Sequence, residues 1–248
     1  IISFQLMRWK GLFRATRQVE YSAEPRAKEG NQLLDREQCI QEITQSGVVA
    51  VIRAESAQEL MNITVALSKG GVKALEITMT SPDAIDVIRE ANRRIGDHAI
   101  IGVGSVLDSE TARTAILAGA QFVVSPVFKL EIVTMCRRYS KACILGAFTP
   151  TEIVTAWEAG ADVIKIFPAT KLGPGYIRDL KGPLPQIKVT PTGGINLENT
   201  GDFIKVGSSF VGVGGALVNR KLVAEQKWDE LTELATEFVK AVSDARLS

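Results

Sequence analysis

Two charged side chains lie within short apolar runs of the sequence, where charged residues are uncommon. Lys165 stands in the run Val-Ile-Lys-Ile-Phe, and Glu76 stands in Ala-Leu-Glu-Ile-Thr. Side chains alternate between the two faces of a strand, so Lys165 shares a face with Val163 and Phe167. Apolar surroundings favour the neutral amine of a lysine, which can attack a ketone and form a Schiff base. A nearby glutamate can then move protons in the later steps.

A simpler interpretation is that Glu76 and Lys165 form a buried ion pair that does no chemistry. Desolvation offsets much of the attraction in such a pair, so it would be weak evidence for stability. The strand alternation places Glu76 on the face opposite Leu75 and Ile77, which suit contact with helices. Periodicity alone leaves the catalytic and the structural interpretations equally open.

Two glycine-rich turns follow later apolar runs. The first contains Gly193 and Gly194 ahead of Asn196, which can cap a helix, and the second contains Gly214 and Gly215. Backbone N–H groups in such turns bind phosphate at the start of a helix. One pair of glycines is common in any turn, but two pairs after the last two strands of a barrel favour a phosphate site.

The elements that must position these residues are regular. Eight short runs rich in β-branched residues are predicted to be strands, at 48–53, 73–79, 99–103, 122–125, 143–147, 162–167, 187–191 and 210–213. Amphipathic stretches between them, such as 57–69, 82–94 and 152–159, are predicted to be helices. This α/β alternation at a spacing of roughly 25 residues indicates a (β/α)8 TIM barrel, with the active site at the carboxyl ends of its strands.

An open, doubly wound sheet is the alternative architecture. It would normally carry a Gly-x-Gly-x-x-Gly turn after its first strand, whereas Arg53 is followed by Ala-Glu-Ser. Helix ends are marked by capping residues. Asp35 is predicted to cap a leading helix over 35–46, and Ser81 is predicted to cap the helix over 82–94, with Pro82 at its first position.

Composition excludes several classes of function. The 248 residues carry 29 Lys and Arg against 28 Asp and Glu. This balance argues against nucleic acid as a main partner, because phosphate backbones require a basic surplus. No apolar run approaches the roughly 20 residues of a membrane span, so no membrane association is expected. One histidine and three scattered cysteines predict no metal site of the common zinc types, and the odd cysteine count favours a reduced, cytoplasmic location. We also expect no cofactor.

The amino end differs from the rest of the sequence. Its first 30 residues carry six basic and three acidic side chains, so the remaining chain has a net charge of about −2. This segment could be an arginine-rich targeting peptide, but a disordered tail or a translation artefact is the favoured interpretation. We therefore expect an N-terminal extension over 1–34 and a barrel domain over 35–248.

Six motifs occur in a characteristic order: LEIT at 75–78, IIGVGSVL at 100–107, VVSPVF at 123–128, IKIFPA at 164–169, PTGGIN at 191–196 and VGVGGALV at 211–218. With these motifs the chain, from about residue 38 to about residue 245, resembles the bacterial 2-keto-3-deoxy-6-phosphogluconate (KDPG) aldolase family, also called KDPG/4-hydroxy-2-oxoglutarate aldolase. The resemblance implies a metal-free class I aldolase on a (β/α)8 barrel, typically a homotrimer. It implies cleavage of KDPG to pyruvate and glyceraldehyde 3-phosphate.

The resemblance also assigns roles to residues. Lys165 matches the Schiff-base lysine of the family, and Glu76 matches its general acid/base. Positions that line the pyruvyl and phosphate pockets match Pro126, Phe167, Thr192, Gly193 and Gly194.

The sequence departs from the family pattern at three places. Some members have an arginine four residues after the glutamate to bind the substrate carboxylate, and here that position is Thr80. Other members, including 6-phosphogalactonate aldolases, have an arginine at the end of the first strand, where this chain has Arg53. Ser105 supplies a hydroxyl where the family has threonine. Gly215 stands where many members have serine, which leaves the backbone near Gly214 and Gly215 to bind the phosphate.

The resulting hypothesis is a cytoplasmic Schiff-base aldolase whose substrate is a small keto-acid sugar phosphate, KDPG. One alternative is a 4-hydroxy-2-oxoglutarate or 6-phosphogalactonate aldolase, which would differ in the distal part of the pocket. A second is a barrel isomerase or epimerase that binds sugar phosphate without an imine. A third is a non-catalytic or engineered trimeric scaffold.

Overall fold

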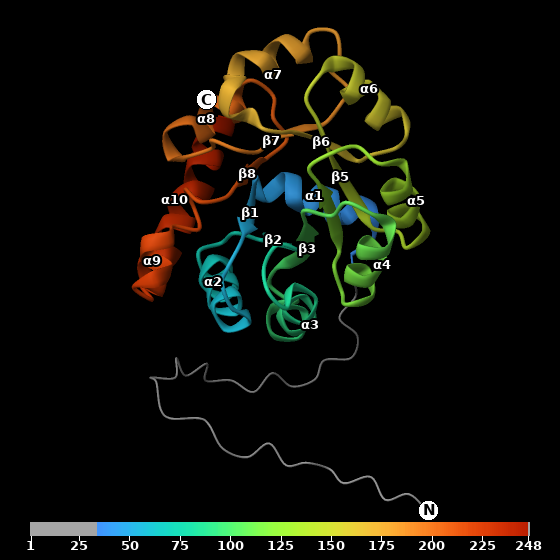
Figure 1. Cartoon of the computed structure of the whole chain (residues 1–248). Helices are drawn as coiled ribbons and strands as arrows, with labels where there is room; N and C mark the ends of the chain where they lie inside the picture. The colour runs from blue at the N-terminus through green and yellow to red at the C-terminus, as the bar shows by residue number, and fades with distance from the viewer. Residues whose placement is uncertain (1–33, 248) are drawn as a thin grey trace, which may run out of the picture. The chain divides into compact units, whose positions relative to one another are not determined.

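The computed structural model describes residues 34–247 (Figure 1). The predicted amino-terminal extension lies outside these residues, apart from its last residue, Leu34. The backbone N–H of Leu34 donates a hydrogen bond to Oε1 of Gln121 at 3.3 Å. No helix among the described residues is long and apolar enough to span a membrane.

Eight parallel strands form one sheet with the order β7-β6-β5-β4-β3-β2-β1-β8. The two outer strands of this order are joined by a bridge between Thr192 and Gly212, and the N–H of Ser209 donates to the carbonyl of Val189 at 2.9 Å. The sheet therefore closes on itself, which confirms the predicted (β/α)8 TIM barrel. The strands are β1 (Val48–Ile52), β2 (Ala74–Thr78), β3 (Ile100–Gly104), β4 (Phe122–Ser125), β5 (Ala142–Ala147), β6 (Val163–Ile166), β7 (Val189–Pro191) and β8 (Val211–Val213).

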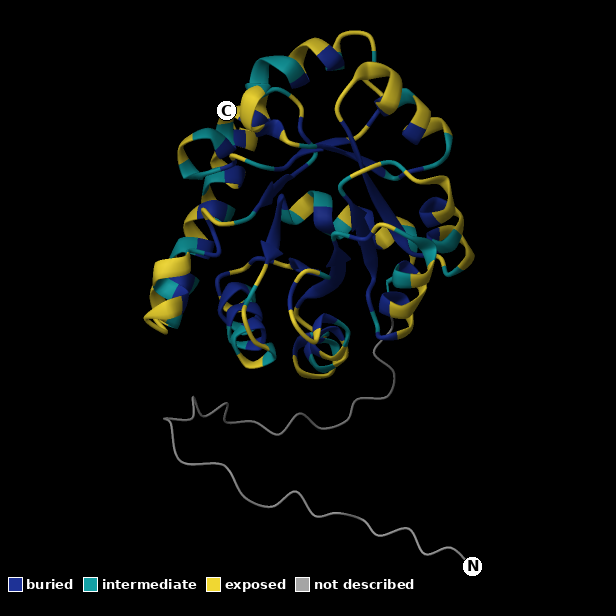
Figure 2. Cartoon of the chain, in the orientation of Figure 1, coloured by how far each residue is buried: buried dark blue, intermediate teal, exposed yellow. Residues whose placement is uncertain are grey.

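Helices surround the strands and expose their outer faces, whereas the strands are buried throughout (Figure 2). They are α1 (Arg36–Ser46), α2 (Ala57–Lys69), α3 (Ala84–Ile95), α4 (Ser109–Leu117), α5 (Leu130–Arg138), α6 (Pro150–Glu158), the 3-10 turn η1 (Ala169–Lys171), α7 (Gly173–Lys181), α8 (Leu197–Lys205), α9 (Arg220–Ala224) and α10 (Trp228–Leu247). α10 packs against both α8 and α2 and so completes the outer layer next to β1 and β8.

The interior of the barrel is a packed core, not a channel. Phe122 of β4 is fully buried there, and a Cβ at Gly102 of β3 would clash with its ring. Glycine at this position therefore makes room for the aromatic side chain. α1 contributes Cys39, Ile40 and Ile43 to the same interior cluster, which closes the amino-terminal end of the barrel.

Helix capping matches the prediction at α1 and differs at α3. Asp35 caps α1 in a capping box, as predicted. The prediction that Ser81 caps the third helix, with Pro82 at its first position, is wrong, because α3 begins at Ala84. Ser81 is buried, and its hydroxyl accepts a hydrogen bond from the N–H of Ala54 at 3.1 Å. The serine thus ties the loops after β1 and β2 together and is not available as a cap.

The predicted strands are one or two residues too long at several ends. Arg53, Met79 and Phe167 each follow the last residue of their strand, at the carboxyl ends of β1, β2 and β6. The N–H groups of Met79 and Phe167 still donate to the carbonyls of Gly104 and Ala147 on the neighbouring strands, at 2.9 and 3.3 Å, although both residues lie past the ends of their strands. The chemistry-bearing positions Arg53 and Phe167 therefore lie in loops at the rim.

Candidate active site

A cavity of about 400 Å³ opens at the carboxyl-terminal end of the barrel. All the residues predicted from the sequence to form the site line it, except Glu76 and Thr80. Four further residues line it: Asn196, which the sequence indicated only as a helix cap, and Val51, Ile195 and Ala216, which it did not indicate. The full lining consists of Val51, Arg53, Ser105, Pro126, Lys165, Phe167, Thr192, Gly193, Gly194, Ile195, Asn196, Gly214, Gly215 and Ala216.

Lys165 reaches the cavity from the middle of the barrel. Val163, two residues earlier on β6, belongs to the interior cluster, so Lys165 occupies the next interior layer toward the carboxyl end. The residue is 6% exposed, and its Nζ lies 5.0 Å from the centroid of the Phe167 ring. Across the ladder it pairs with Gly146 of β5 and Thr190 of β7. The amine is therefore held among apolar and small residues while it faces the cavity.

Glu76 lies in the same barrel interior as Lys165, but it does not line the cavity. Ala74, two residues earlier on β2, belongs to the interior cluster, and Glu76 is 3% exposed. Its Oε1 is buried and has no hydrogen-bond partner within the described residues. A buried polar atom without a hydrogen-bond partner lowers the free energy of unfolding by about 1–3 kcal/mol, so the position of this oxygen destabilises the fold.

The buried ion pair that the sequence left open does not form. Glu76 and Lys165 are both described, and no ion pair joins them or joins either to another residue in the described range. Gly104 of β3 is what accommodates the glutamate, because a Cβ at Gly104 would clash with the carboxylate of Glu76. The arrangement leaves the amine of Lys165 in the cavity wall and the carboxylate of Glu76 in the barrel interior, with no ion pair to either among the described residues.

The double-glycine turn after β7 presents backbone donors to the cavity. Gly193 and Gly194 have φ values of 93° and 76°, a left-handed conformation that favours glycine. Their N–H groups donate no hydrogen bond within residues 34–247. Asn196 caps α8 directly after the turn, in a capping box with Asn199. Free N–H groups at the start of a helix form a ready anion site.

Thr170 of η1 packs on this turn and was not indicated by the sequence. A Cβ at Gly194 would lie 3.1 Å from Oγ1 of Thr170, and one at Gly193 would lie 3.4 Å from it. The N–H of Ala169 donates to the carbonyl of Thr192 at 2.9 Å, which holds η1 against the turn. The contact joins loops that follow β6 and β7, so no local sequence pattern could have revealed it.

Arg53 reaches the second glycine turn. A Cβ at Gly214 would lie 4.0 Å from Nη1 of Arg53, whereas one at Gly215 would meet open space. The arginine predicted to bind a carboxylate and the turn predicted to bind phosphate therefore adjoin each other. Ser105 also lines the cavity and has a φ of 59°, which is unusual for a residue with a side chain.

Thr80 lies apart from the other predicted residues. It is exposed and does not line the cavity, and its Oγ1 lies 3.0 Å from Oγ1 of Thr78. Thr78 in turn donates to the carbonyl of Ile52 at 3.1 Å. The hydroxyl of Thr80 thus supports the loop after β2.

The loop after β5 is fixed by a carboxylate. Oε2 of Glu152 accepts hydrogen bonds from the N–H groups of Phe148 and Thr149, each at 2.8 Å, and these bonds lower the pKa of Glu152. The hydroxyl of Tyr176 in α7 donates to the carbonyl of Phe148 at 2.6 Å, and burial raises the pKa of this tyrosine. These hydrogen bonds tie the loop after β5 to α6 and α7.

Within residues 34–247, no group of three or more His, Cys, Asp or Glu side chains is placed to hold a metal ion. The cavity is lined by the amine of Lys165, the guanidinium of Arg53, the hydroxyls of Ser105 and Thr192, and the backbone of the two glycine turns.

Comparison with known proteins assigns the chain to a family. The family model for KDPG and KHG aldolase matches residues 39–234. The chain is 33% identical to 2-dehydro-3-deoxy-phosphogluconate aldolase of Haemophilus influenzae, over 83% of this chain and 97% of that protein. It is 34% identical to 2-dehydro-3-deoxy-6-phosphogalactonate aldolase of Escherichia coli, over 82% of this chain and 97% of that protein.

A solved structure of KDPG aldolase from Legionella pneumophila, with pyruvate captured at low pH as a covalent carbinolamine intermediate, superposes with a TM-score of 0.75. It is 27% identical and covers 80% of this chain and 97% of its own. The family match covers most of the chain, and the relatives are matched over nearly their whole length. The chain therefore belongs to the KDPG and KHG aldolase family and is an aldolase, a carbon–carbon lyase.

Proposed function

We propose that the protein is a Schiff-base aldolase that cleaves KDPG to pyruvate and glyceraldehyde 3-phosphate through Lys165. The observation that carries this proposal is the placement of Lys165, a buried lysine that forms no ion pair with any residue of 34–247 and lines a cavity together with Arg53 and two glycine turns. The covalent carbinolamine with pyruvate in the Legionella relative supports the same chemistry.

In the proposed reaction, Nζ of Lys165 attacks the keto carbon C2 of the substrate. The carbonyl oxygen takes up protons and leaves as water, which produces an iminium ion. Loss of the proton from the C4 hydroxyl then breaks the C3–C4 bond, and the bonding electrons move into an enamine of pyruvate. Protonation at C3 and hydrolysis release pyruvate and free the lysine.

Glu76 is the proposed proton carrier for these steps. Its Oε1 has no partner among the described residues, so it is available to a hydroxyl or water held at C2 or C4. Burial against Gly104 fixes the position of the carboxylate and limits competing contacts with bulk water.

The two ends of the substrate need separate anion sites. We propose that Arg53 and Ser105 orient the carboxylate and that the backbone at Gly193, Gly194, Gly214 and Gly215 holds the phosphate. A second candidate substrate is 2-dehydro-3-deoxy-6-phosphogalactonate, the C4 epimer. The 34% identity to the Escherichia coli enzyme named for it favours this candidate.

A cleavage panel tests the substrate. KDPG, its C4 epimer and 4-hydroxy-2-oxoglutarate are compared by kcat/KM, with pyruvate release as the readout. The proposal expects both phosphorylated substrates to exceed the unphosphorylated one, and KDPG to be the best. Equal kcat/KM for phosphorylated and unphosphorylated substrates would show that the glycine turns do not bind phosphate.

Replacement of Arg53 by alanine tests which anion this guanidinium binds. If Arg53 binds the carboxylate, Arg53→Ala weakens the binding of both pyruvate and KDPG by roughly 10-fold or more. The reason is that charge-assisted hydrogen bonds contribute about 1.5–3 kcal/mol. The measurements are the KM for KDPG and the Kd for pyruvate. A higher KM for KDPG with an unchanged Kd for pyruvate would contradict the carboxylate assignment. It would instead assign Arg53 to the phosphate end of the substrate, beside Gly214.

Replacement of Gly104 by alanine tests the placement of Glu76. The added methyl group would occupy the space of the Glu76 carboxylate, so we expect turnover to fall by about 10-fold or more, as it does when a catalytic proton carrier is displaced. Gly175→Ala, in α7 and outside the cavity lining, is the matched control, because a Cβ there would meet no atom within 4 Å. Unchanged turnover in folded Gly104→Ala protein would contradict the role of Glu76.

We also propose that the protein is a homotrimer. Large exposed apolar side chains follow the adjacent strands β3, β4 and β5: Leu107, Val127 and Phe148 lie in the loops after these strands, and Leu130 is the first residue of α5. Such a patch is typical of a protein interface.

Light scattering tests the homotrimer and should give three times the chain mass of 26.8 kDa. Leu130→Glu should dissociate the assembly, whereas Leu117→Glu, at an equally exposed leucine elsewhere, should not; a monomeric parent protein would contradict the proposal.

A further inference from the structure

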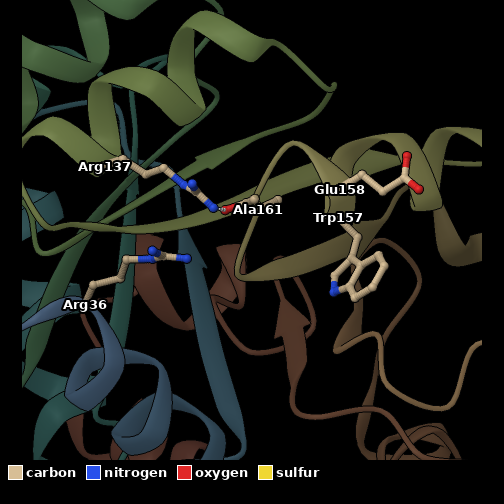
Figure 3. A pocket seen from close by; sticks show the side chains of 6 residues that line it. Arg36, Arg137, Trp157, Glu158 and Ala161 are labelled. Carbon is tan, nitrogen blue, oxygen red and sulfur yellow. Dashed lines mark hydrogen bonds between the residues drawn. The ribbon is translucent and has the colours of Figure 1, made fainter.

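A second cavity lies at the opposite, amino-terminal end of the barrel. It has a volume of about 460 Å³ and is separate from the cavity of Lys165. Residues from α1, α5, the end of α6 and the loop that enters β6 line it (Figure 3). They are Arg36, Arg137, Trp157, Glu158, Gly160 and Ala161.

Arg137 is held over a glycine with most of its donors unused. Gly160 has a φ of 98°, and a Cβ there would clash with the guanidinium of Arg137, so a glycine makes the position of this arginine possible. The guanidinium makes one long hydrogen bond, from Nη2 to the carbonyl of Gly160 at 3.5 Å. Within residues 34–247 it forms no ion pair. Arg137 is exposed, and because a guanidinium has five N–H donors, most of its donors remain available to water or to a ligand in the cavity.

Arg36 is fixed on the other side by a carboxylate. Its Nε donates to Oδ1 of Asp162 at 2.6 Å, and this bond raises the pKa of Arg36. Oδ2 of Asp162 accepts the N–H of Cys143 at 2.8 Å, so the carboxylate is held by two partners. The bond uses only Nε of Arg36, which leaves its two Nη groups for another acceptor.

The two guanidinium groups extend from different elements toward the loop at Ala161 (Figure 3). The carboxylate of Glu158 is directed away from them in the same view, and the indole of Trp157 forms a further wall. Forked guanidinium donors match the oxygens of a phosphate group, and two of them can bind one group together.

We propose that this amino-terminal cavity binds a phosphate group through Arg36 and Arg137, either as free phosphate or as part of a small phosphorylated metabolite. The site is independent of the proposed aldol chemistry, because it lies at the other end of the barrel from Lys165. Its ligand would contact residues of α1, α5 and the loop before β6, and so would link the helix that closes the barrel to the outer layer.

Binding of inorganic phosphate tests the proposal, with ionic strength held constant by chloride. Equilibrium dialysis gives the affinity and stoichiometry, and tryptophan fluorescence reports on Trp157.

Because the active-site cavity is also expected to bind phosphate, the test compares variants. Arg137→Gln should weaken the amino-terminal site by roughly 10- to 100-fold, the effect of losing charge-assisted hydrogen bonds. Arg138→Gln, at the adjacent exposed arginine that does not line the cavity, should leave it unchanged.

A dialysis isotherm that is the same for Arg137→Gln and the parent protein would overturn the proposal. Equal weakening by Arg137→Gln and Arg138→Gln would also overturn it, since that result reflects general surface charge. Trp157→Phe should abolish the phosphate-dependent fluorescence change while the dialysis isotherm keeps its stoichiometry. A second titration with adenosine monophosphate distinguishes the sources: tighter binding than inorganic phosphate assigns a phosphorylated metabolite, and equal binding assigns free phosphate.

Discussion

Lys165→Arg is expected to abolish aldol cleavage while the barrel remains folded. Arginine keeps the positive charge and most of the length of the side chain, but it cannot form the iminium ion on which the proposed reaction depends. Loss of a covalent nucleophile lowers turnover by roughly 10⁴-fold or more. The measurement is pyruvate release from KDPG, with circular dichroism to confirm the fold.

Lys141→Arg is the matched control for this variant. Lys141 is also largely buried, at 9% exposure, but it directly precedes β5 at the amino-terminal end of the barrel. The Lys141→Arg protein should therefore retain full turnover. Cleavage by folded Lys165→Arg protein within 10-fold of the parent, about 1.4 kcal/mol in the barrier, would rule out Lys165 as the nucleophile.

Glu76→Gln is expected to lower turnover by about 10²- to 10⁴-fold, the usual contribution of general acid–base catalysis. Glutamine keeps the shape of the side chain but cannot take up or release a proton at the carboxyl group. The same variant should slow the exchange of the methyl protons of pyruvate with solvent, which proton NMR in D₂O measures. Pyruvate should still label Lys165, since the amine is unchanged.

The control for Glu76 is Glu233→Gln, at an exposed glutamate on α10. Near-normal cleavage together with near-normal methyl exchange in Glu76→Gln protein would contradict the proposed role. It would leave Glu76 as a buried carboxylate whose unpartnered oxygen has no catalytic function.

The barrel could be predicted from the sequence because its strands and helices carry local periodic signals. The alternation with period two also placed Glu76 and Lys165 in the interior, and the structure confirms this orientation through their neighbours Ala74 and Val163. The pattern could not decide whether the two side chains would pair. Whether they do depends on the positions of β2 and β6 around the barrel, and these are not adjacent strands.

The remaining features of the site depend on contacts between loops, which carry no periodic signal. Ser81 has the sequence features of a helix cap, yet it bonds to Ala54 across two loops. The packing of Thr170 on Gly194 and the approach of Arg53 to Gly214 are likewise contacts between segments far apart in the sequence. Such contacts join loops that follow neighbouring strands of the sheet, so residue types and spacing within one segment alone could not reveal them.

Reductive trapping tests the central claim most directly. The protein is incubated with pyruvate and sodium borohydride, and the labelled peptide is identified by mass spectrometry. The proposed mechanism predicts one pyruvyl group per chain, attached to Lys165, and no label in Lys165→Arg protein. A label on another lysine, or no label in protein that actively cleaves KDPG, would contradict it.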